Sequence, residues 1–448
     1  VGLEDIGPPR KDPTWHFEDA PVPISSFRVG TNGITYHQII TALPKLTAEE
    51  TRLLPIYNGL ISEIGSNSRG HEQTQLLQQA LTGGIHGFLS ARACVEDFDN
   101  YSAYCFLSSK TMPDKVQAMI TLMKETALTP NFKERGRIRD LIKQFRIRRD
   151  AGITGNGHML AAGAAAAGLR PTTSLSYNLS GLGSILYLRN LDDTLKGRSG
   201  LEDLQSSLER LHARLLEGAR QLLLVCDPSS ESVSREALRS SWPEKRGIAN
   251  NFVAEVDGFD NDVAFVANTK INFCASVYPT TVPAHEDSPV LSVLAGILRN
   301  SYLHNEIREK GGAYGGGAIH DSANGVFKFF SFRDPNLLDT FAAFEKSLDW
   351  VTSSKLSSEN VEEAVLGVIS SLDAPGTPAG EAKQCFHHEL FGIKQESRRE
   401  FRERVLDTQV QDIRRVAQTY FGNKVRRAVV TNSEHRSHVE SKFDIIEL

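Results

Sequence analysis

The order of predicted strands, helices and glycines repeats once along the chain, and this repeat restricts the fold more than any other feature of the sequence. In the second half, residues 271–277 alternate as a strand does, and a predicted helix, a glycine-rich stretch and a strand at 326–332 follow. In the first half, a strand at 34–40, a helix, the glycines 83–84 and a strand near 101–107 follow in the same order. The chain therefore predicts two copies of one domain.

The glycines set the alignment of the two copies. Gly83-Gly84-Ile85-His86-Gly87 aligns with Gly311-Gly312-Ala313-Tyr314-Gly315, which stands 228 residues later. A repeat of this length is a whole domain and not the short unit of a solenoid. We expect an α+β fold with two homologous domains, each a mostly antiparallel sheet with helices packed on one face. The predicted divisions are a linker at 1–23, a first domain at 24–230, a connector at 231–261 and a second domain at 262–448.

Composition excludes several classes of protein. The 448 residues carry 50 Lys and Arg against 55 Asp and Glu, and this near balance argues against a nucleic-acid partner, which needs a basic surface. No apolar run approaches the ~18 residues of a membrane span. The five cysteines form no C-x-x-C pair, so a disulfide framework is not expected and a reducing compartment is favoured. Residues 1–23 are acidic and contain five prolines, which is typical of a linker.

The histidines do not have the spacing of a metal site. The chain has 13 of them but contains neither H-E-x-x-H nor H-x-x-E-H. His71-Glu72 is followed by Gln-Thr-Gln, and His388-Glu389 by Leu-Phe-Gly, so neither pair is completed one helical turn later. His387 and His388 are adjacent and would point to different sides of a helix. We therefore predict that no residue of this chain binds a metal.

The glycine-rich stretch at 311–317 does not match a nucleotide-binding loop. A P-loop ends in Gly-Lys-Ser/Thr, whereas Ala318-Ile319 follows here. A dinucleotide-binding loop opens into a helix, whereas this stretch leads to a predicted strand. The chain also has no Gly-x-Ser-x-Gly elbow to anchor a serine hydrolase triad. Nucleotide binding at this stretch and a serine hydrolase triad are therefore not expected.

Arg308-Glu-Lys-Gly-Gly-Ala-Tyr314 remains as the candidate site. Tyr314 is the only large side chain within the glycine stretch, and Arg308 stands where the preceding helix ends, close to Glu306 and Glu309. One interpretation is structural: Arg308 forms a surface ion pair, and Tyr314 lies on a strand edge. The other interpretation gives these two side chains a functional role. The first copy has Ala80 and His86 at these positions, so the glycine turn does not itself require an arginine and a tyrosine.

This stretch resembles a family signature. Leu303-His-Asn-Glu-Ile-Arg-Glu-Lys-Gly-Gly-Ala-Tyr-Gly-Gly-Gly317 is similar to a segment in the C-terminal half of presequence proteases, which are pitrilysin/insulinase zinc metalloendopeptidases. Phe332-Arg-Asp-Pro-Asn336 and Ser371-Leu-Asp-Ala-Pro375 support the resemblance, which extends over about 21–434. The residues Glu-Ile-Arg-Glu-Lys of this segment are more similar to the mitochondrial branch of the family than to the bacterial or plastid branches.

The resemblance implies a fold and a mechanism. The family has four homologous domains of the LuxS/metallohydrolase type, arranged as two bowl-like halves that enclose a chamber. Its N-terminal half carries H-x-x-E-H and a distal Glu that bind zinc. Its C-terminal half contributes an Arg and a Tyr that bind substrate and take part in catalysis, and these match Arg308 and Tyr314. The two copies would be the third and fourth domains, with zinc in the N-terminal half only, so this chain alone is expected to be inactive.

The expected function follows from this resemblance. The chain would be the C-terminal half of a zinc metalloendopeptidase that degrades presequences and other short unstructured peptides. Its partners would be the N-terminal catalytic half and peptide substrates, with no nucleic acid and no membrane. The expected location is the mitochondrial matrix, or otherwise the cytoplasm. The alternative is a non-catalytic partner or core subunit of a heterodimeric processing peptidase. An in-frame H-x-x-E-H domain pair upstream of Val1 would favour the first interpretation, and a start codon at that point the second.

Overall fold

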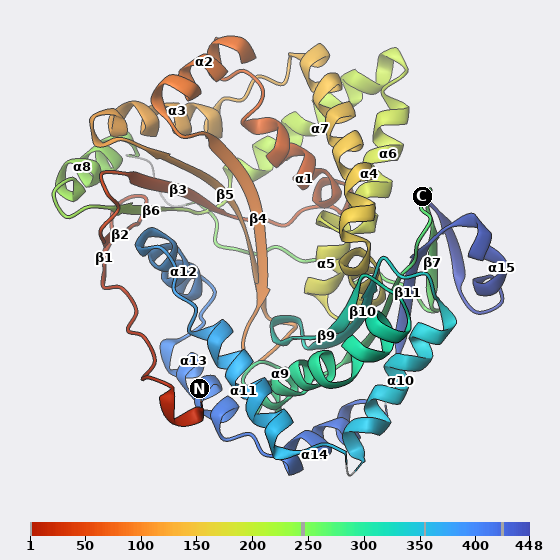
Figure 1. Cartoon of the computed structure of the whole chain (residues 1–448). Helices are drawn as coiled ribbons and strands as arrows, with labels where there is room; N and C mark the ends of the chain where they lie inside the picture. The colour runs from red at the N-terminus through yellow and green to blue at the C-terminus, as the bar shows by residue number, and fades with distance from the viewer. Residues whose placement is uncertain (1, 243–246, 354, 423–424) are drawn as a thin grey trace.

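The computed structural model describes residues 2–242, 247–353, 355–422 and 425–448, and their strands form two six-stranded sheets (Figure 1). The first sheet has the order β1-β2-β6-β3-β5-β4 and the second the order β12-β7-β11-β8-β10-β9. The strands of the first sheet are β1 (Trp15–Glu18), β2 (Ile24–Arg28), β3 (Thr35–Ala42), β4 (Ile85–Ala93), β5 (Tyr101–Thr111) and β6 (Arg220–Cys226). Those of the second are β7 (Val263–Val266), β8 (Phe273–Pro279), β9 (Gly315–Asp321), β10 (Val326–Phe332), β11 (Arg426–Thr431) and β12 (Asp444–Glu447).

Five strands of each sheet have the same order and the same directions, which confirms the duplication. The pair β2–β6 is parallel, as is β7–β11, and the remaining pairs from β6 to β4 and from β11 to β9 are antiparallel. The sixth strand differs, since β1 pairs antiparallel with β2 whereas β12 pairs parallel with β7. Gly84 and Gly312 both adopt a left-handed backbone, with φ of 97° and 78°, just before the edge strands β4 and β9. The predicted glycine alignment is therefore confirmed.

The helices fill the long connections between the strands. In the first half they are η1 (Leu3–Asp5), α1 (Ala48–Ile61), α2 (His71–Leu81), η2 (Pro113–Lys115), α3 (Val116–Leu128), α4 (Arg135–Ala166), α5 (Pro171–Leu179), α6 (Leu182–Thr194), α7 (Arg198–Leu216) and α8 (Glu231–Ser241). In the second half they are α9 (Asp287–Ile297), η3 (Leu298–Lys310), η4 (Ser322–Asn324), α10 (Leu338–Thr352), α11 (Ser358–Leu372), α12 (Pro378–Leu390), α13 (Gln395–Leu406), α14 (Val410–Tyr420), η5 (Ser433–His435) and α15 (Arg436–Val439). No helix within the described ranges is long and apolar enough to cross a membrane.

Local sequence explains where several helices begin and bend. Thr47 and Glu50 form the capping box expected at the start of α1: the Glu50 amide donates to Thr47 Oγ1 at 3.2 Å, and the Thr47 amide to Glu50 Oε2 at 2.8 Å. The long helix α4 is kinked at Asn156, where φ is −137° and ψ is 20°. Ile138 and Leu141, near the start of α4, belong to the first core, whereas Ile153 and the buried residues after the kink pack against the second sheet.

Each sheet packs its own helices on one face, which confirms the α+β class. In the first half, Leu54 and Leu60 of α1 share a core with Ile39 of β3 and Leu222 of β6. In the second half, the helices α9, η3, α10, α11 and α14 pack over β8, β10 and β11, with Phe329 at the centre of that core. Neighbouring residues of a strand point to opposite faces, so these cores use only every second position.

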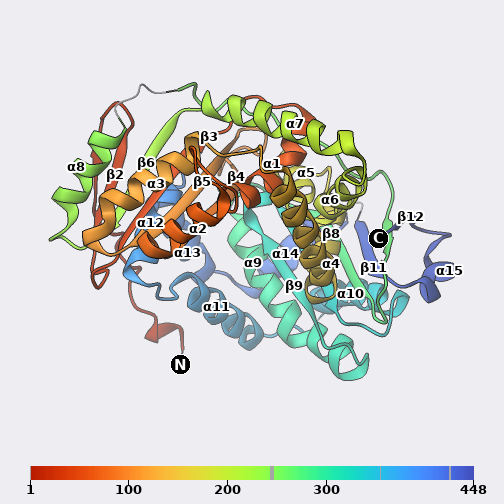
Figure 2. The ribbon, with the colours of Figure 1, turned by 90° about the horizontal axis from the view of Figure 1, so that it is seen from above.

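The other face of each sheet is covered by a helix from the opposite half of the chain. Ala382 and Phe386 of α12 pack on Phe27, Ile40 and Phe106 of the first sheet. Figures 1 and 2 show α12, from the blue part of the chain, lying against the red and orange strands.

The C-terminal segment of α4 covers the second sheet in the same way and packs its alanines against Phe273 and Ala275. Gly157 of α4 approaches so closely that a Cβ there would lie 2.5 Å from the Phe273 ring. The two halves are therefore interlocked.

Two predicted boundaries need correction. Residues 1–23, predicted as a linker, include β1, which pairs with β2 as an edge strand of the first sheet. Residues 231–261, predicted as a connector, include α8, whose Glu231 accepts a hydrogen bond from Ser26 of β2. Ion pairs from Arg235 and Arg239 of α8 to Glu18 of β1 join the two segments. The sequence did not predict β1 and α8, because β1 has only four residues and α8 is mostly polar.

Candidate functional site

The turn between η3 and β9 places Arg308 and Tyr314 side by side. Arg308 lies in the last turn of η3, and the amide of Gly312 donates to its carbonyl oxygen at 3.0 Å. The left-handed conformation of Gly312 ends the helix and reverses the chain, as glycine does in helix C-caps. A Cβ at Gly311 would lie 2.6 Å from the Ile307 carbonyl oxygen, so this position also requires glycine. Tyr314 then directly precedes the edge strand β9.

Both side chains lie at the surface and contact each other. The Arg308 guanidinium carbon lies 5.9 Å from the centroid of the Tyr314 ring, within the range of a cation–π contact. Tyr314 is 66% exposed, and its ring packs edge-on against Phe332 of β10 at 5.7 Å. Its amide donates to the Arg333 carbonyl oxygen at 3.2 Å, which extends the β9–β10 ladder by one residue. The backbone therefore fixes Tyr314, while its ring remains accessible.

Arg308 does not form the surface ion pair that the structural interpretation predicts. Glu306 pairs with Lys310, with Nζ 2.5 Å from Oε1, and Glu309 lies 3.5 Å from His304 Nδ1. Within the part of the chain that the structure describes, no carboxylate lies within ion-pair distance of Arg308. The guanidinium is therefore free to bind an oxygen supplied from outside the chain.

Arg333 is a third side chain at this site, and no role for it is predicted from the sequence. Its guanidinium carbon lies 5.9 Å from the Tyr314 ring centroid and 5.3 Å from that of Phe332. It is exposed and adopts a left-handed backbone with φ of 51°. It stands in the Phe332–Asn336 stretch that supported the family resemblance, and this stretch was the only signal that could have drawn attention to it.

A buried polar network fixes the Arg333 turn to the glycine turn. Asn272 and Asp334 exchange two backbone hydrogen bonds of 2.8 and 2.9 Å, and the Asn336 side chain donates to the Gly311 carbonyl oxygen at 2.6 Å. The Asp334 carboxyl is fully buried and accepts from Thr340 Oγ1 at 2.7 Å. Burial raises the pKa of Asp334, and its hydrogen bonds oppose this increase. The network holds the segments that carry Arg308, Tyr314 and Arg333 in one arrangement.

The strand that follows Tyr314 has almost no side chains at its start. Gly315, Gly316 and Gly317 open β9, the edge strand of the second sheet. A Cβ at Gly315 would meet no atom within 4 Å, whereas one at Gly316 would lie 2.8 Å from Ile307. Gly315 therefore leaves open space beside Tyr314, while Gly316 allows η3 to pack closely. An extended segment could approach the backbone at this edge.

The equivalent turn of the first half has the same backbone but not the same side chains. Gly84 adopts the left-handed conformation before β4, and His86 and Ala80 replace Tyr314 and Arg308. Both replacements are exposed. The fold therefore builds this turn twice, and only the second copy carries a guanidinium and a phenol.

The site is not suited to hold a metal. Its polar side chains are two arginines and a tyrosine, and arginine cannot be deprotonated to act as a ligand. Within the described ranges, no group of three His, Cys, Asp or Glu side chains is placed to hold a metal ion.

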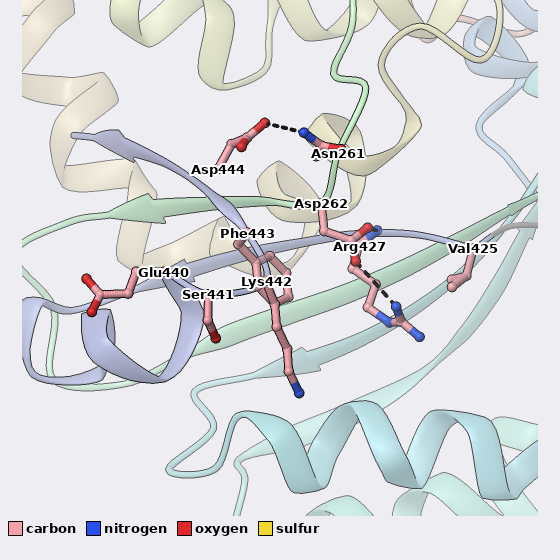
Figure 3. Close-up of a pocket in the computed structure, with 9 residues that line it drawn as sticks. All are labelled: Asn261, Asp262, Val425, Arg427, Glu440, Ser441, Lys442, Phe443 and Asp444. Atoms are coloured by element: carbon pink, nitrogen blue, oxygen red, sulfur yellow. Dashed lines mark hydrogen bonds and ion pairs between the residues drawn. The ribbon is translucent and has the colours of Figure 1, made fainter.

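A hollow lies at the other edge of the second sheet. It has a volume of about 630 Å³ and is open and polar (Figure 3). Its lining residues are Asn261, Asp262, Val425, Arg427, Glu440, Ser441, Lys442, Phe443 and Asp444. The Arg427 guanidinium there is already paired with Asp262 and with Glu345. Because the sheet order separates β12 and β7 from β9, this hollow is not part of the Arg308–Tyr314 site.

Two family models and several curated relatives match the chain. Residues 1–191 match the family described as associated with M16 peptidases of subfamily C, and residues 262–434 match the PreP C-terminal domain. The mitochondrial presequence protease of Emericella nidulans is 31% identical over 434 residues, which cover 92% of this chain and 40% of the relative. Those of Xenopus laevis and Drosophila melanogaster are 27% and 26% identical and cover 93% and 94% of this chain. The chain thus spans about two fifths of the length of these relatives, at 40%, 43% and 41%.

Solved structures show the same fold. A conserved protein from Enterococcus faecalis superposes with a TM-score of 0.68 at 12% identity, covering 94% of this chain and 99% of that one. A protease from Helicobacter pylori gives 0.62 at 13% identity, with 94% and 100% covered. A peptidase M16 inactive domain from Pseudomonas fluorescens gives 0.60 at 13% identity, with 94% and 98% covered. At such identities the similarity concerns the fold alone.

Proposed function

Because this chain belongs to the presequence protease family of M16 peptidases and matches the C-terminal half of its members, we propose that it serves as that half of a zinc metalloendopeptidase. The proposed substrates are presequences and other short unstructured peptides. The names of the relatives support a mitochondrial location, and the matrix is the compartment proposed within it. The zinc, in this proposal, is bound in the N-terminal half, and the chain alone is inactive.

The observation that carries the proposal is the free donor pair at the η3–β9 turn. Arg308 and Tyr314 are exposed and lie together, and Arg308 has no carboxylate partner among the described residues. Hydrolysis of a peptide bond creates negative charge on the carbonyl oxygen, and preorganised donors stabilise that charge. The Tyr314 hydroxyl and the Arg308 guanidinium would donate hydrogen bonds to this oxygen. A guanidinium group is a charged donor with a planar fork of N–H groups, which suits an oxygen that gains negative charge during the reaction.

The separation of donors and zinc between two halves would couple peptide capture to chemistry. Arg308 and Tyr314 would reach the scissile carbonyl only when the two halves close around the peptide. Binding energy from the peptide would then assemble the complete site, as in induced-fit enzymes. A closed chamber would also exclude folded proteins, which fits substrates that are short and unstructured.

The test uses this chain joined to the N-terminal half of a relative such as the Emericella nidulans protease. Cleavage of a quenched fluorescent peptide is measured for the parent and for Tyr314→Phe and Arg308→Lys. Tyr302→Phe is the matched control, because Tyr302 lies on η3, the helix that also carries Arg308. We expect a large loss of kcat in the two site variants and none in the control. Full activity of both site variants would instead favour the alternative, a non-catalytic partner of a heterodimeric processing peptidase.

A further inference from the structure

The backbone at Arg333 is unusual for its residue type. Among the described residues, three residues other than glycine have a positive φ: Asn32, Asn67 and Arg333, at 55°, 58° and 51°. Asparagine tolerates this conformation because its short polar side chain bonds locally. Arginine has no such compensation, so its Cβ is held in a strained position. Glycine or asparagine would fold more easily at residue 333.

The turn itself does not need the arginine side chain. The Arg333 carbonyl oxygen accepts from the Tyr314 amide at 3.2 Å, and the next residue, Asp334, is held by Asn272. These are backbone contacts that any residue at position 333 would keep. The fold therefore does not explain why an arginine stands at this strained position, and its guanidinium group is the feature that remains to explain it. Strained residues of this kind concentrate at functional sites.

The Arg333 guanidinium lacks an anionic partner. The adjacent carboxylate, Asp334, is buried and bound to Thr340 and Asn336. No carboxylate in the described part of the chain pairs with Arg333. Two exposed guanidinium groups thus lie near one phenol ring, each 5.9 Å from its centroid. Two like charges at one site favour binding of an anion, and one donor pair is already sufficient for the carbonyl oxygen of the proposed function.

We infer that Arg333 is a specificity-determining residue that binds a carboxylate of the peptide, and this inference rests on the proposed function. The planar guanidinium fork matches a carboxylate, which can accept two parallel hydrogen bonds. Gly315, which lies opposite Phe332 in the β9–β10 ladder, leaves open space beside the site for the peptide backbone. The carboxylate has two sources, an acidic side chain of the peptide or its C-terminal group.

The test measures peptide binding by this chain through fluorescence anisotropy. Four labelled peptides of one sequence carry either Glu or Gln at one position and either a free or an amidated C-terminus. Each is titrated with the parent chain, Arg333→Gly, Arg333→Lys and Asn67→Gly. The last variant places glycine at another left-handed position, which lies in the first half of the chain between α1 and α2. Melting temperatures are recorded for all four proteins.

We expect the parent to bind the peptide that bears the recognised carboxylate about tenfold more tightly than its neutral counterpart. Arg333→Gly should abolish this preference while melting at the same or a higher temperature, and Arg333→Lys should keep only part of it. Asn67→Gly should leave it unchanged. The Glu/Gln pair and the acid/amide pair show which source is recognised.

Equal binding of charged and neutral peptides by the parent, including no binding to either, would overturn the inference. The inference would also be overturned if Arg333→Gly preferred the charged peptide as strongly as the parent does. The proposed function fails independently, when Tyr314→Phe and Arg308→Lys of the joined enzyme retain full turnover.

Discussion

The interlocking of the two halves makes a quantitative prediction at Phe386. This side chain of α12 is 3% exposed and packs on Phe27, Ile40 and Phe106 of the first sheet, although it comes from the second half of the chain. Burial of a phenylalanine removes about 150–200 Å² from water, which at about 25 cal/mol per Å² is about 4–5 kcal/mol. Phe386→Ala should therefore lower the free energy of unfolding by about 3–5 kcal/mol, the range measured for such truncations.

The assay is urea denaturation followed by tryptophan fluorescence. Trp242 belongs to the core of the first half and Trp350 packs on that of the second, so variants that retain only one of them report on one half each. If α4 and α12 join the halves, the two reporters should show one coincident transition. Phe386→Ala should shift both reporters to lower urea.

The control is Phe17→Ala, which truncates the same residue type at an edge strand where the side chain is 50% exposed. It should lower the free energy of unfolding by about 1 kcal/mol or less. The interlocked packing would be refuted by separate transitions of Trp242 and Trp350 in the parent. It would also be refuted if Phe386→Ala cost no more than Phe17→Ala.

Three further predictions concern the turn and the acidic stability of the chain. Tyr314→Phe should lower kcat of the joined enzyme by about 10²–10³ with an unchanged melting temperature, because its exposed ring loses only a hydroxyl; a lowered melting temperature with full activity would contradict this. Gly312→Ala should lower the free energy of unfolding in urea by about 1 kcal/mol, because φ of 78° strains any Cβ, and an unchanged value would show that the turn relaxes. Hydrogen bonds from Arg239 and Arg235 lower the pKa of Glu18 to about 2, so the stability it contributes is complete above the ordinary carboxyl range and is lost as the pH falls toward 2. Glu18→Gln should therefore destabilise the chain at pH 7 and much less near pH 2, and a destabilisation independent of pH would argue against the ion pairs.

The sequence was sufficient to predict the duplication because local backbone requirements carry that signal. Gly84 and Gly312 stand at turns where a left-handed conformation is needed, and such turns are visible without knowledge of the tertiary structure. The alternating strands that flank them repeat in the same order. Arg308 and Tyr314 could be singled out because they flank the glycine turn in a stretch that resembles a family signature, whereas the first copy has Ala80 and His86 at these positions.

The covering of the second face of each sheet could not be predicted in this detail. Leu222, Leu223, Leu224 and Val225 of β6 are all buried, and such a continuous apolar run indicates a strand covered on both faces. The run does not identify what covers it, because the sequence of an amphipathic helix such as α12 does not show which sheet the helix packs against. The Arg333 turn was missed for a similar reason, since its backbone is set by contacts with Tyr314 and Asn272.

The interlocked arrangement gives the first half a structural role at the proposed site, although that half lacks the proposed site residues. The Tyr314 ring rests on Phe332, and His158 of α4 packs against the same phenylalanine at 4.8 Å. The alanines of α4 also cover Phe273 and neighbouring apolar residues on that face of the second sheet. Without the first half, this face would be exposed to water and Phe332 would lose a contact that supports Tyr314. The first copy can therefore lack an arginine and a tyrosine at its own turn and still contribute to the site, because it supplies the surface on which the second copy's site is built.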